Sequence, residues 1–426
     1  MNSIYYIPFQ ILSEYLTIDD LVTLSQFDEY FNKKIYKNID VSLDFTSDDF
    51  VSYNTILDTF KTSVVRLSTH SYREFSEIPA KFAEKIVELL WELSRDITIV
   101  ELKSCVNLKK LTIDGSNFTD SQLSLLTELT SLTCARGENT PFDTITDLGL
   151  RHCTKLVELG LFGWQLPITD YGIETLTNLT KLSIGGDGEC IDLTARSLTK
   201  LSKLRSLGAN CNGTIDDQLL ASLSHLTSLC LSNDATITNE GIKPLTNLLS
   251  LNLYATRGIT EVGFQHLTLL EDLTLDHMDI KSDSFKYLVN LTSFSMCTPN
   301  NLIPEDLLKM TKLGSLALKY QYLPSISDDT LSKLTNLTAL DLTYNKIITD
   351  HGIISLLNLG VFNGPDSNIT TKALLQLPSL RELTIYGNSQ FGRDEALFVA
   401  KGLRITNSHP PEKFKEIERH YSNNYW

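Results

Sequence analysis

One line of sequence recurs along this chain and constrains its fold more than any other feature. The plainest copy is Leu337-Thr-Ala-Leu340-Asp-Leu342-Thr-Tyr-Asn345, which reads LxxLxLxxN. Successive copies begin 19 to 27 residues apart. A period of this size predicts a stack of repeated units, each of which contacts only its neighbours. The first leucines of the thirteen lines are Leu108, Leu129, Leu156, Leu179, Leu204, Leu226, Leu248, Leu270, Leu291, Leu313, Leu337, Leu356 and Leu380.

Each line holds two apolar residues separated by a single residue, a spacing that predicts a short strand with one buried face. A second line, Ile168-Thr-Asp170-Tyr-Gly172-Ile173, lies between strands and recurs with variations from Ile237, Ile259, Ile326 and Ile348. Thr or Ser followed by an acidic residue predicts a helix start, because the hydroxyl accepts a bond from an unpaired N–H and a carboxylate suits the positive end of a helix. Each repeat is therefore predicted to place a strand on the concave side and a short helix on the convex side.

The period and the LxxLxLxxN line resemble the leucine-rich-repeat family over about three quarters of the chain. This resemblance implies an α/β fold, a horseshoe-shaped solenoid, over residues 108–405. The I-T-D-x-G line is similar to the repeats of F-box proteins. Asn-x-Thr triplets such as Asn178-Leu-Thr180 are interpreted as part of the repeat rather than as glycosylation sites.

The segments on either side of the regular repeats are less clear. Residues 41–107 are interpreted as irregular first repeats, with strands expected around Val41, Leu67 and Ile99, and apolar residues at helical spacing between Pro79 and Leu93. Residues 406–426, in which Pro410 and Pro411 break the pattern, are interpreted as a C-terminal cap and tail.

Residues 1–40 differ from the repeats, because their apolar residues recur at a spacing that predicts three short helices. The stretches Ile7-Pro8-Phe9-Gln10-Ile11-Leu12, Tyr15-Leu16 and Asp20-Leu21-Val-Thr-Leu24 resemble the opening and middle of an F-box. Phe27 and Phe31 fall at the Cys and Trp positions of that motif. The chain departs from it at Gln10 and Phe31, and is shorter by nearly one helical turn, about three residues, between Pro8 and Asp20.

The F-box resemblance implies that this helical module binds a Skp-type adaptor and, through it, a cullin ligase. The alternative is that the three helices only cap the first repeat, since a solenoid otherwise exposes an apolar end. The residues that would form the module core and the adaptor contact are Ile7, Pro8, Ile11, Leu12, Leu16, Leu21, Leu24, Phe27 and Phe31.

Charge and composition narrow the classes of partner. The net charge is −15 and the isoelectric point about 5.0, which argues against nucleic acid, whose phosphates require clustered Lys and Arg. No basic patch or apolar run predicts a membrane contact, and the N-terminus does not read as a secretory signal. Seven cysteines without a CxxC pair are interpreted as reduced thiols of a cytoplasmic protein, with the nucleus as a second location.

No catalytic, metal-binding or cofactor-binding motif is present, so none of these sites is predicted. A target protein is instead expected on the concave face, where aromatic residues lie beside small ones such as Gly160, Ser183 and Ala317. The alternative for any single aromatic residue is stacking between neighbouring strands. The predicted target-binding residues are Phe162, Trp164, Tyr254, His277, Lys319, Tyr320, Tyr344, Phe362 and Tyr386.

These features together favour a substrate-recognition subunit of a Skp–cullin–F-box ubiquitin ligase, which would catalyse no reaction itself. The second reading is an adaptor-independent leucine-rich-repeat scaffold for protein interactions. A third class, regulators of GTPases, also uses leucine-rich repeats, and no Arg or Lys of this sequence is singled out for that role.

Overall fold

The computed structural model describes part of the chain, which folds as two compact units. Unit 1 comprises residues 1–180 and 191–203, and unit 2 comprises residues 181–190 and 204–426. The predicted F-box-like module at residues 1–40 and the tail from residue 407 lie outside the described residues. The described residues are 41–44, 65–69, 83–84, 86–92, 99–114, 118–136, 145–163, 167–185, 193–210, 215–233, 236–278, 280, 285–297, 302–320, 326–365, 367–384 and 391–406.

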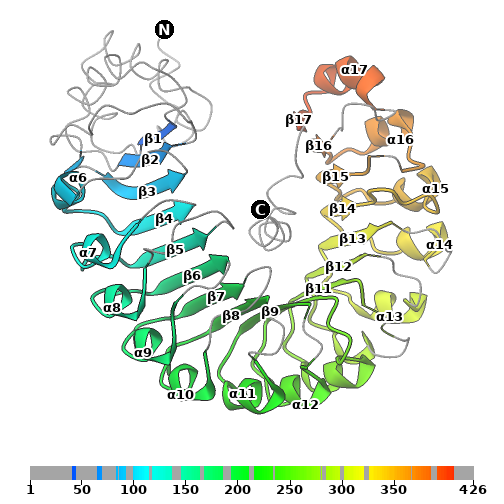
Figure 1. Ribbon diagram of the computed structural model, residues 1–426. Coiled ribbons are helices and arrows are strands. Elements are labelled where there is room, and N and C mark those ends of the chain that lie inside the picture. Colours follow the sequence, from blue (N-terminus) through cyan, green and yellow to red (C-terminus); the bar gives the residue numbers. More distant parts are fainter. Residues whose placement is uncertain are drawn as a thin grey trace, which may run out of the picture. The chain divides into compact units, whose positions relative to one another are not determined.

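Unit 1 alternates parallel strands with short helices (Figure 1). Each strand pairs in parallel with the next one along the chain from β1 to β6. The described elements of unit 1 are β1 (Val41–Asp44), β2 (Val65–Thr69), β3 (Ile86–Glu92), α6 (Ile99–Ser104), β4 (Lys110–Asp114), α7 (Asp120–Leu123), β5 (Ser131–Arg136), α8 (Asp147–Leu150), β6 (Glu158–Gly163), α9 (Asp170–Ile173) and α10 (Ala195–Leu198).

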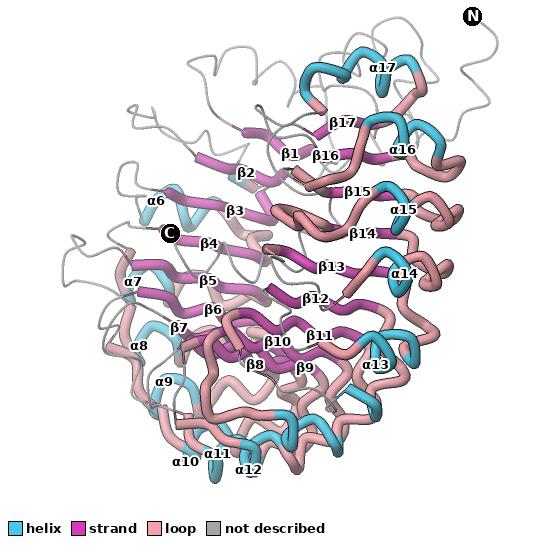
Figure 2. Tube along the Cα trace, turned by 90° about the vertical axis from the view of Figure 1, so that its right-hand side faces the viewer, coloured by secondary structure: helices cyan, strands magenta, loops and turns pink. Residues whose placement is uncertain are grey.

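Unit 2 repeats the same pattern from β7 to β17, with the strands on its inner side and the helices on its outer side (Figures 1 and 2). Its described elements are β7 (Lys181–Gly185), β8 (Ser206–Asn210), α11 (Asp217–Ser222), β9 (Ser228–Ser232), α12 (Asn239–Ile242), β10 (Ser250–Tyr254), η2 (Glu261–His266), β11 (Asp272–Asp276), η3 (Phe285–Tyr287), β12 (Ser293–Cys297), α13 (Pro304–Lys309), β13 (Ser315–Lys319), α14 (Asp328–Leu331), β14 (Ala339–Asp341), α15 (Asp350–Ile353), β15 (Val361–Asn363), α16 (Thr371–Gln376), β16 (Glu382–Thr384), η4 (Gly392–Asp394), α17 (Glu395–Ala400) and β17 (Arg404–Thr406).

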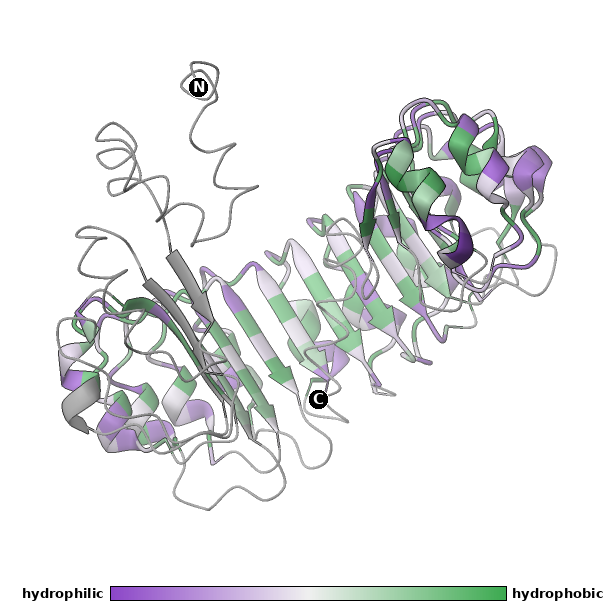
Figure 3. Ribbon diagram, turned by 90° about the horizontal axis from the view of Figure 1, so that it is seen from above, coloured by the Kyte–Doolittle hydropathy of each residue, from purple (hydrophilic) through white to green (hydrophobic). Residues whose placement is uncertain are grey.

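The repeated leucines fill the space between the strand layer and the helix layer of each unit. In the plainest repeat Leu337, Leu340 and Leu342 have no exposed area, and Ile348 and Ile353 of the helical return close the same core. Along several strands the hydropathy alternates from residue to residue, visible as green and pale bands in Figure 3. The predicted strands are confirmed, but the single buried face is not. In unit 2 the residues between the strand leucines, such as Thr274, Ser295 and Ala317, are buried as well.

The helix starts predicted from the I-T-D-x-G line are also confirmed. Helices α9, α12, α14 and α15 begin at the residue after Thr or Ser, and η2 begins in the same way as a tighter 3₁₀ helix. The N-cap hydroxyls of Thr169, Thr238 and Thr349 accept a hydrogen bond from the backbone of the first turn.

The prediction was wrong for residues 86–92 and 99–103, although strands β1 and β2 lie where they were expected. Residues predicted to be helical form strand β3, and the stretch predicted as a strand around Ile99 forms helix α6. The register pairs Leu89 with Leu111 and Trp91 with Ile113. Ile86-Val-Glu-Leu89-Leu-Trp91 is therefore an additional copy of the repeat line, in which isoleucine and tryptophan take two leucine positions.

A second correction concerns the line that was assigned to Leu356. Strand β15 pairs Val361 with Ala339 and Phe362 with Leu340, so this line begins at Leu359. Phe362 occupies an inward leucine position and has no exposed area. Its ring fills the space that a side chain at Gly364 would need, which explains why the second strand leucine is absent here. Phe362 is a core residue and does not face a target.

Asparagine and threonine of the Asn-x-Thr triplets bond the repeat before their own. Asn178 Nδ2 donates to the Thr154 carbonyl at 3.0 Å, and Thr180 Oγ1 donates to the Val157 carbonyl at 3.2 Å. In unit 2 the Asn336 and Thr338 side chains make the same two contacts. The triplets therefore have a structural role, as their interpretation as repeat consensus requires.

Candidate target-binding surface

Most of the predicted target-binding residues of unit 2 lie at or just after the C-terminal ends of strands β10, β11, β13 and β14. Tyr254 and Lys319 are the last residues of β10 and β13, and the parallel register places Asp276 beside Tyr254 and Cys297 beside Lys319. His277 and Tyr320 directly follow the last residues of β11 and β13, and Tyr344 lies three residues after the end of β14. We call this group the strand-end cluster, which consists of Tyr254, Asp276, His277, Lys319, Tyr320 and Tyr344.

The backbone at the second of these positions is left-handed. Tyr320 and Tyr344 each have φ of 54° and His277 has φ of 51°, and the equivalent residues Asn233 and Ala255 have similar values. The Tyr320 N–H donates to the Thr343 carbonyl of the next repeat at 3.0 Å. Left-handed backbone disfavours bulky side chains by about 1–2 kcal/mol. The conformation of this turn therefore does not account for tyrosine or histidine at these positions. The sequence pattern alone does not reveal this conformation.

The aromatic rings of the cluster are arranged in two pairs. Tyr320 and Tyr344 stack with ring centres 5.2 Å apart and an angle of 16° between planes. Tyr254 and His277 meet edge to face at 5.1 Å. Tyr320 and Tyr344 are 40% and 41% exposed, and the His277 side chain is 61% exposed. Such pairs hold their rings in place before a partner arrives, which lowers the entropy cost of binding.

A buried polar network lies beside the aromatic rings. Asp341 Oδ2 lies 3.3 Å from Lys319 Nζ and accepts a hydrogen bond of 2.9 Å from Asn363 Nδ2. Asp341 Oδ1 accepts bonds from the Thr343 backbone N–H at 2.9 Å and from its hydroxyl at 2.6 Å. The Asp341 carboxylate is thus satisfied at both oxygens. Sequence reasoning missed Asp341 and Asn363, and only the register places them next to Lys319.

Two acceptors of this region have no donor within the described structure. Asp276 Oδ1 and Asn363 Oδ1 are buried and make no hydrogen bond. The residues that carry them are 9% and 2% exposed. Buried polar atoms nearly always have a hydrogen-bond partner. We call a buried oxygen that lacks a donor an orphan oxygen, and its presence requires an explanation.

Two ionisable groups near the cluster, Cys297 and Tyr320, are held in their neutral forms. Burial, followed by the neighbouring Asp276 carboxylate, raises the pKa of the Cys297 thiol. Burial and the nearby Cys297 raise the pKa of the Tyr320 phenol. Neither group therefore adds a negative charge near neutral pH, and Asp276 is the acidic side chain of the cluster itself.

The remaining predicted target residues do not join this cluster. Phe162 is half-buried on β6 of unit 1, where its ring lies over Gly160, 2.9 Å from the point a Cβ would occupy. Trp164 and Tyr386 lie outside the described residues, and Phe362 belongs to the core.

Within the described ranges no group of three or more His, Cys, Asp or Glu side chains is placed to hold a metal ion. The described helices include none long and apolar enough to cross a membrane.

Comparison with known proteins identifies the fold. A chain in the crystal structure of the yeast Rad7–Elc1 complex matches with a TM-score of 0.50 and 23% identity, covering 70% of this chain and 85% of that one. A leucine-rich-repeat protein of Leptospira interrogans matches with a TM-score of 0.49 and 17% identity, over 86% of this chain and all (100%) of that one. An internalin from Listeria monocytogenes gives 0.44 and 18%, over 78% and 86%.

No protein-family model and no curated protein matches the sequence. At such low identities a structural likeness shows the fold and nothing more. The parallel strands, the short helical returns and the period of the core leucines give this chain an α/β leucine-rich-repeat fold.

Proposed function

We propose that this chain recruits a target protein to a Skp–cullin–F-box ubiquitin ligase. Residues 1–40 would bind the Skp-type adaptor, and the strand-end cluster of unit 2 would bind the target. The chain would catalyse no bond formation itself. It would raise the local concentration of the target beside the enzyme that transfers ubiquitin, and proximity of this kind can account for a large rate increase.

The observation that carries the target half of the proposal is the exposed Tyr320–Tyr344 stack. Both tyrosines adopt a left-handed backbone conformation that is unfavourable for a residue with a bulky side chain. Tyrosine is enriched at the centres of protein interfaces, where a rigid ring contributes contact area at little entropy cost. A surface of this composition is better suited to binding a protein than to catalysis.

The adaptor half of the proposal rests on the F-box resemblance of residues 1–40. The structural likeness to a chain of the yeast Rad7–Elc1 complex adds only that a protein of similar fold has been found in a complex with another protein. We assign the adaptor contact to the apolar residues named for it above, among which Leu21 and Leu24 share the face of one predicted helix.

Co-purification of the full chain with a recombinant Skp-type adaptor tests the proposal. The wild-type chain is expected to retain the adaptor, and a Leu21→Asp, Leu24→Asp double variant is expected to lose it. Leu148→Asp is the matched control, because Leu148 is 69% exposed on α8 of unit 1 and tolerates a charge. All three proteins should show the same circular dichroism spectrum.

The alternative function is an adaptor-independent scaffold, in which residues 1–40 only cap the first repeat. It would be favoured by a folded wild-type chain that retains no adaptor while its strand-end cluster still binds a protein.

A further inference from the structure

We propose that the strand-end cluster recognises an arginine or lysine side chain in an extended segment of the target. The cationic group would bond Asp276 Oδ1, and neighbouring parts of the segment would lie against the Tyr320–Tyr344 stack. The inference rests on the proposed role of this surface in target binding, and it adds the chemical class of the ligand.

The orphan oxygen of Asp276 is the first argument. It is buried without a hydrogen-bond donor, and the nearest cation-forming atom recorded for it is His277 Nε2 at 3.8 Å, beyond hydrogen-bond reach. A buried carboxylate oxygen without a donor is unfavourable by itself. A ligand that supplies a cationic N–H would remove this deficit, and such charge-assisted bonds are the strongest of their kind.

The local balance of charge is the second argument. Lys319 lies against the fully buried Asp341, whose charge it offsets. The thiol of Cys297, which ends the strand between Asp276 and Lys319, is kept neutral by burial and by Asp276. Asp276 therefore remains the carboxylate of the cluster that lacks a cationic hydrogen-bond partner. A net charge of −15 on the whole chain would also draw basic segments towards it.

The aromatic residues fit the same ligand. Guanidinium and ammonium groups are attracted to the faces of tyrosine rings, and arginine also stacks on them. Tyr320 and Tyr344 are stacked and about two fifths exposed. His277, the most exposed side chain of the cluster, stands beside Asp276 and is the group that would turn aside to admit a ligand.

A second orphan acceptor indicates how the segment would lie. Asn363 Oδ1 is on β15, four strands along from Asp276 on β11. Neighbouring strands are about 4.8 Å apart, so the two strands that carry these oxygens are roughly 19 Å apart across the sheet, a distance that an extended peptide spans in about six residues. The segment would therefore cross the strands and present two donor side chains about six residues apart.

Fluorescence polarisation with the full-length chain tests the inference. The probe is a labelled Gly/Ser peptide of about twelve residues with two arginines six positions apart, and its partner probe has citrulline, the uncharged analogue, at both positions. We expect saturable binding of the arginine peptide alone. Asp276→Asn should weaken it by about tenfold or more, since one charge-assisted bond is lost, and Tyr344→Ala should also weaken it.

Glu240→Gln is the matched control, because it removes the same charge from a side chain that is 74% exposed on α12. It should bind the arginine peptide as the wild type does, at both low and high salt. Asp276→Asn nearly keeps the shape of the side chain, so its circular dichroism spectrum should match that of the wild type.

Three results would overturn the inference: equal binding of the citrulline peptide, equal binding by Asp276→Asn, or no saturable binding of the arginine peptide. Adaptor retention by the same proteins separates this outcome from the proposed function. A chain that binds the peptide but retains no adaptor would keep the inference and exclude the ligase role, and the reverse result would exclude the inference alone.

Discussion

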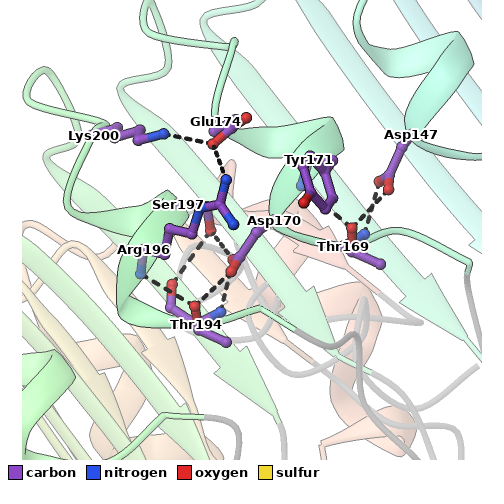
Figure 4. Close-up of polar contacts among 9 residues, drawn as sticks. All are labelled: Asp147, Thr169, Asp170, Tyr171, Glu174, Thr194, Arg196, Ser197 and Lys200. Atoms are coloured by element: carbon purple, nitrogen blue, oxygen red, sulfur yellow. Dashed lines mark hydrogen bonds and ion pairs between the residues drawn. The ribbon is translucent and has the colours of Figure 1, made fainter.

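Asp170 of one repeat accepts hydrogen bonds from Thr194 of the next, through the Thr194 backbone N–H at 2.9 Å and its hydroxyl at 2.5 Å (Figure 4). Asp170 is the first residue of α9, and Thr194 is the N-cap of α10. Asp147 and Thr169 form the same contact one repeat earlier. The acidic residue of the I-T-D-x-G line thus joins successive helical returns, beyond its expected role at the start of its own helix.

The first prediction follows from this contact in unit 2, where Asp328 bonds the Thr349 backbone at 2.8 Å and its hydroxyl at 2.5 Å. Asp328→Ala is expected to lower the free energy of unfolding by about 1–3 kcal/mol, because it leaves those donors without an acceptor. Asp329→Ala is the matched control, since Asp329 is exposed in the same first turn, and its effect should stay within about 0.5 kcal/mol. Urea denaturation measures both; equal losses would refute the structural role.

The second prediction concerns the glycine of the same line. A Cβ at Gly352 would lie 2.6 Å from Asp328 Oδ1, so the carboxylate of one repeat needs the glycine of the next. Gly352→Ala should destabilise the protein by about 1–3 kcal/mol. Gly314→Ala should be tolerated, because its nearest neighbour would be 3.7 Å away.

A double-mutant cycle checks this coupling. In the Asp328→Ala, Gly352→Ala variant the contact at 2.6 Å disappears with the carboxylate, and the tight contact of 3.0 Å with Ile348 Cγ2 remains. The combined loss of stability should therefore be smaller than the sum of the two single losses. Strict additivity would show that Gly352 is required for another reason.

The third prediction separates two residues that the sequence placed on one surface. Phe362→Ala should cost about 3–5 kcal/mol of stability, since it empties a buried site and uncovers Gly364. Tyr344→Ala should change the melting temperature little, because that ring is 41% exposed. Thermal unfolding distinguishes them, and a stable Phe362→Ala variant would contradict the register of β15.

The fourth prediction concerns pH. Burial raises the pKa of Cys153 and of Cys230 from the usual 9.0 to about 12. Above pH 9 these thiols ionise in the unfolded chain and stay neutral in the folded one, so unfolding releases protons. Their contribution to stability is therefore complete below pH 9 and declines as the pH rises towards 12.

Alkylation at pH 8, read out by mass spectrometry of peptides, provides the measurement. Cys153 and Cys230 should react far more slowly in the folded protein than in urea, since the thiolate is the nucleophile. Rapid labelling of both in the folded state would show that they are not buried.

The sequence predicted the repeat, its strands and its helix starts because each depends on spacing within one repeat. The contacts between repeats could not be predicted from the sequence, because the hydrogen bond between Asp328 and Thr349 depends on how neighbouring repeats are aligned. The same limit explains the errors. Phe362 was assigned to the surface because Leu356 and Leu359 are both acceptable first leucines, and only pairing with β14 selects Leu359.

The candidate site was predictable in part for the same reason. Tyr320 and Tyr344 stand at equivalent positions of adjacent repeat lines, which predicts that their side chains lie close together, as the ring stack shows. The buried Asp341 and the orphan oxygen of Asp276 depend on which strands lie beside them and on the left-handed turn after each strand. The repeat that contains β3 was not recognised from the sequence, because Ile86 and Trp91 replace two of its leucines.

Hydrogen–deuterium exchange of the full chain, with and without a Skp-type adaptor, tests the central claim most directly. The account predicts slower exchange in peptides from residues 1–40 and unchanged exchange in strands β11 to β15, which would remain open to a target. Protection of β11 to β15 by the adaptor, or no protection of residues 1–40 at saturating adaptor, would contradict it.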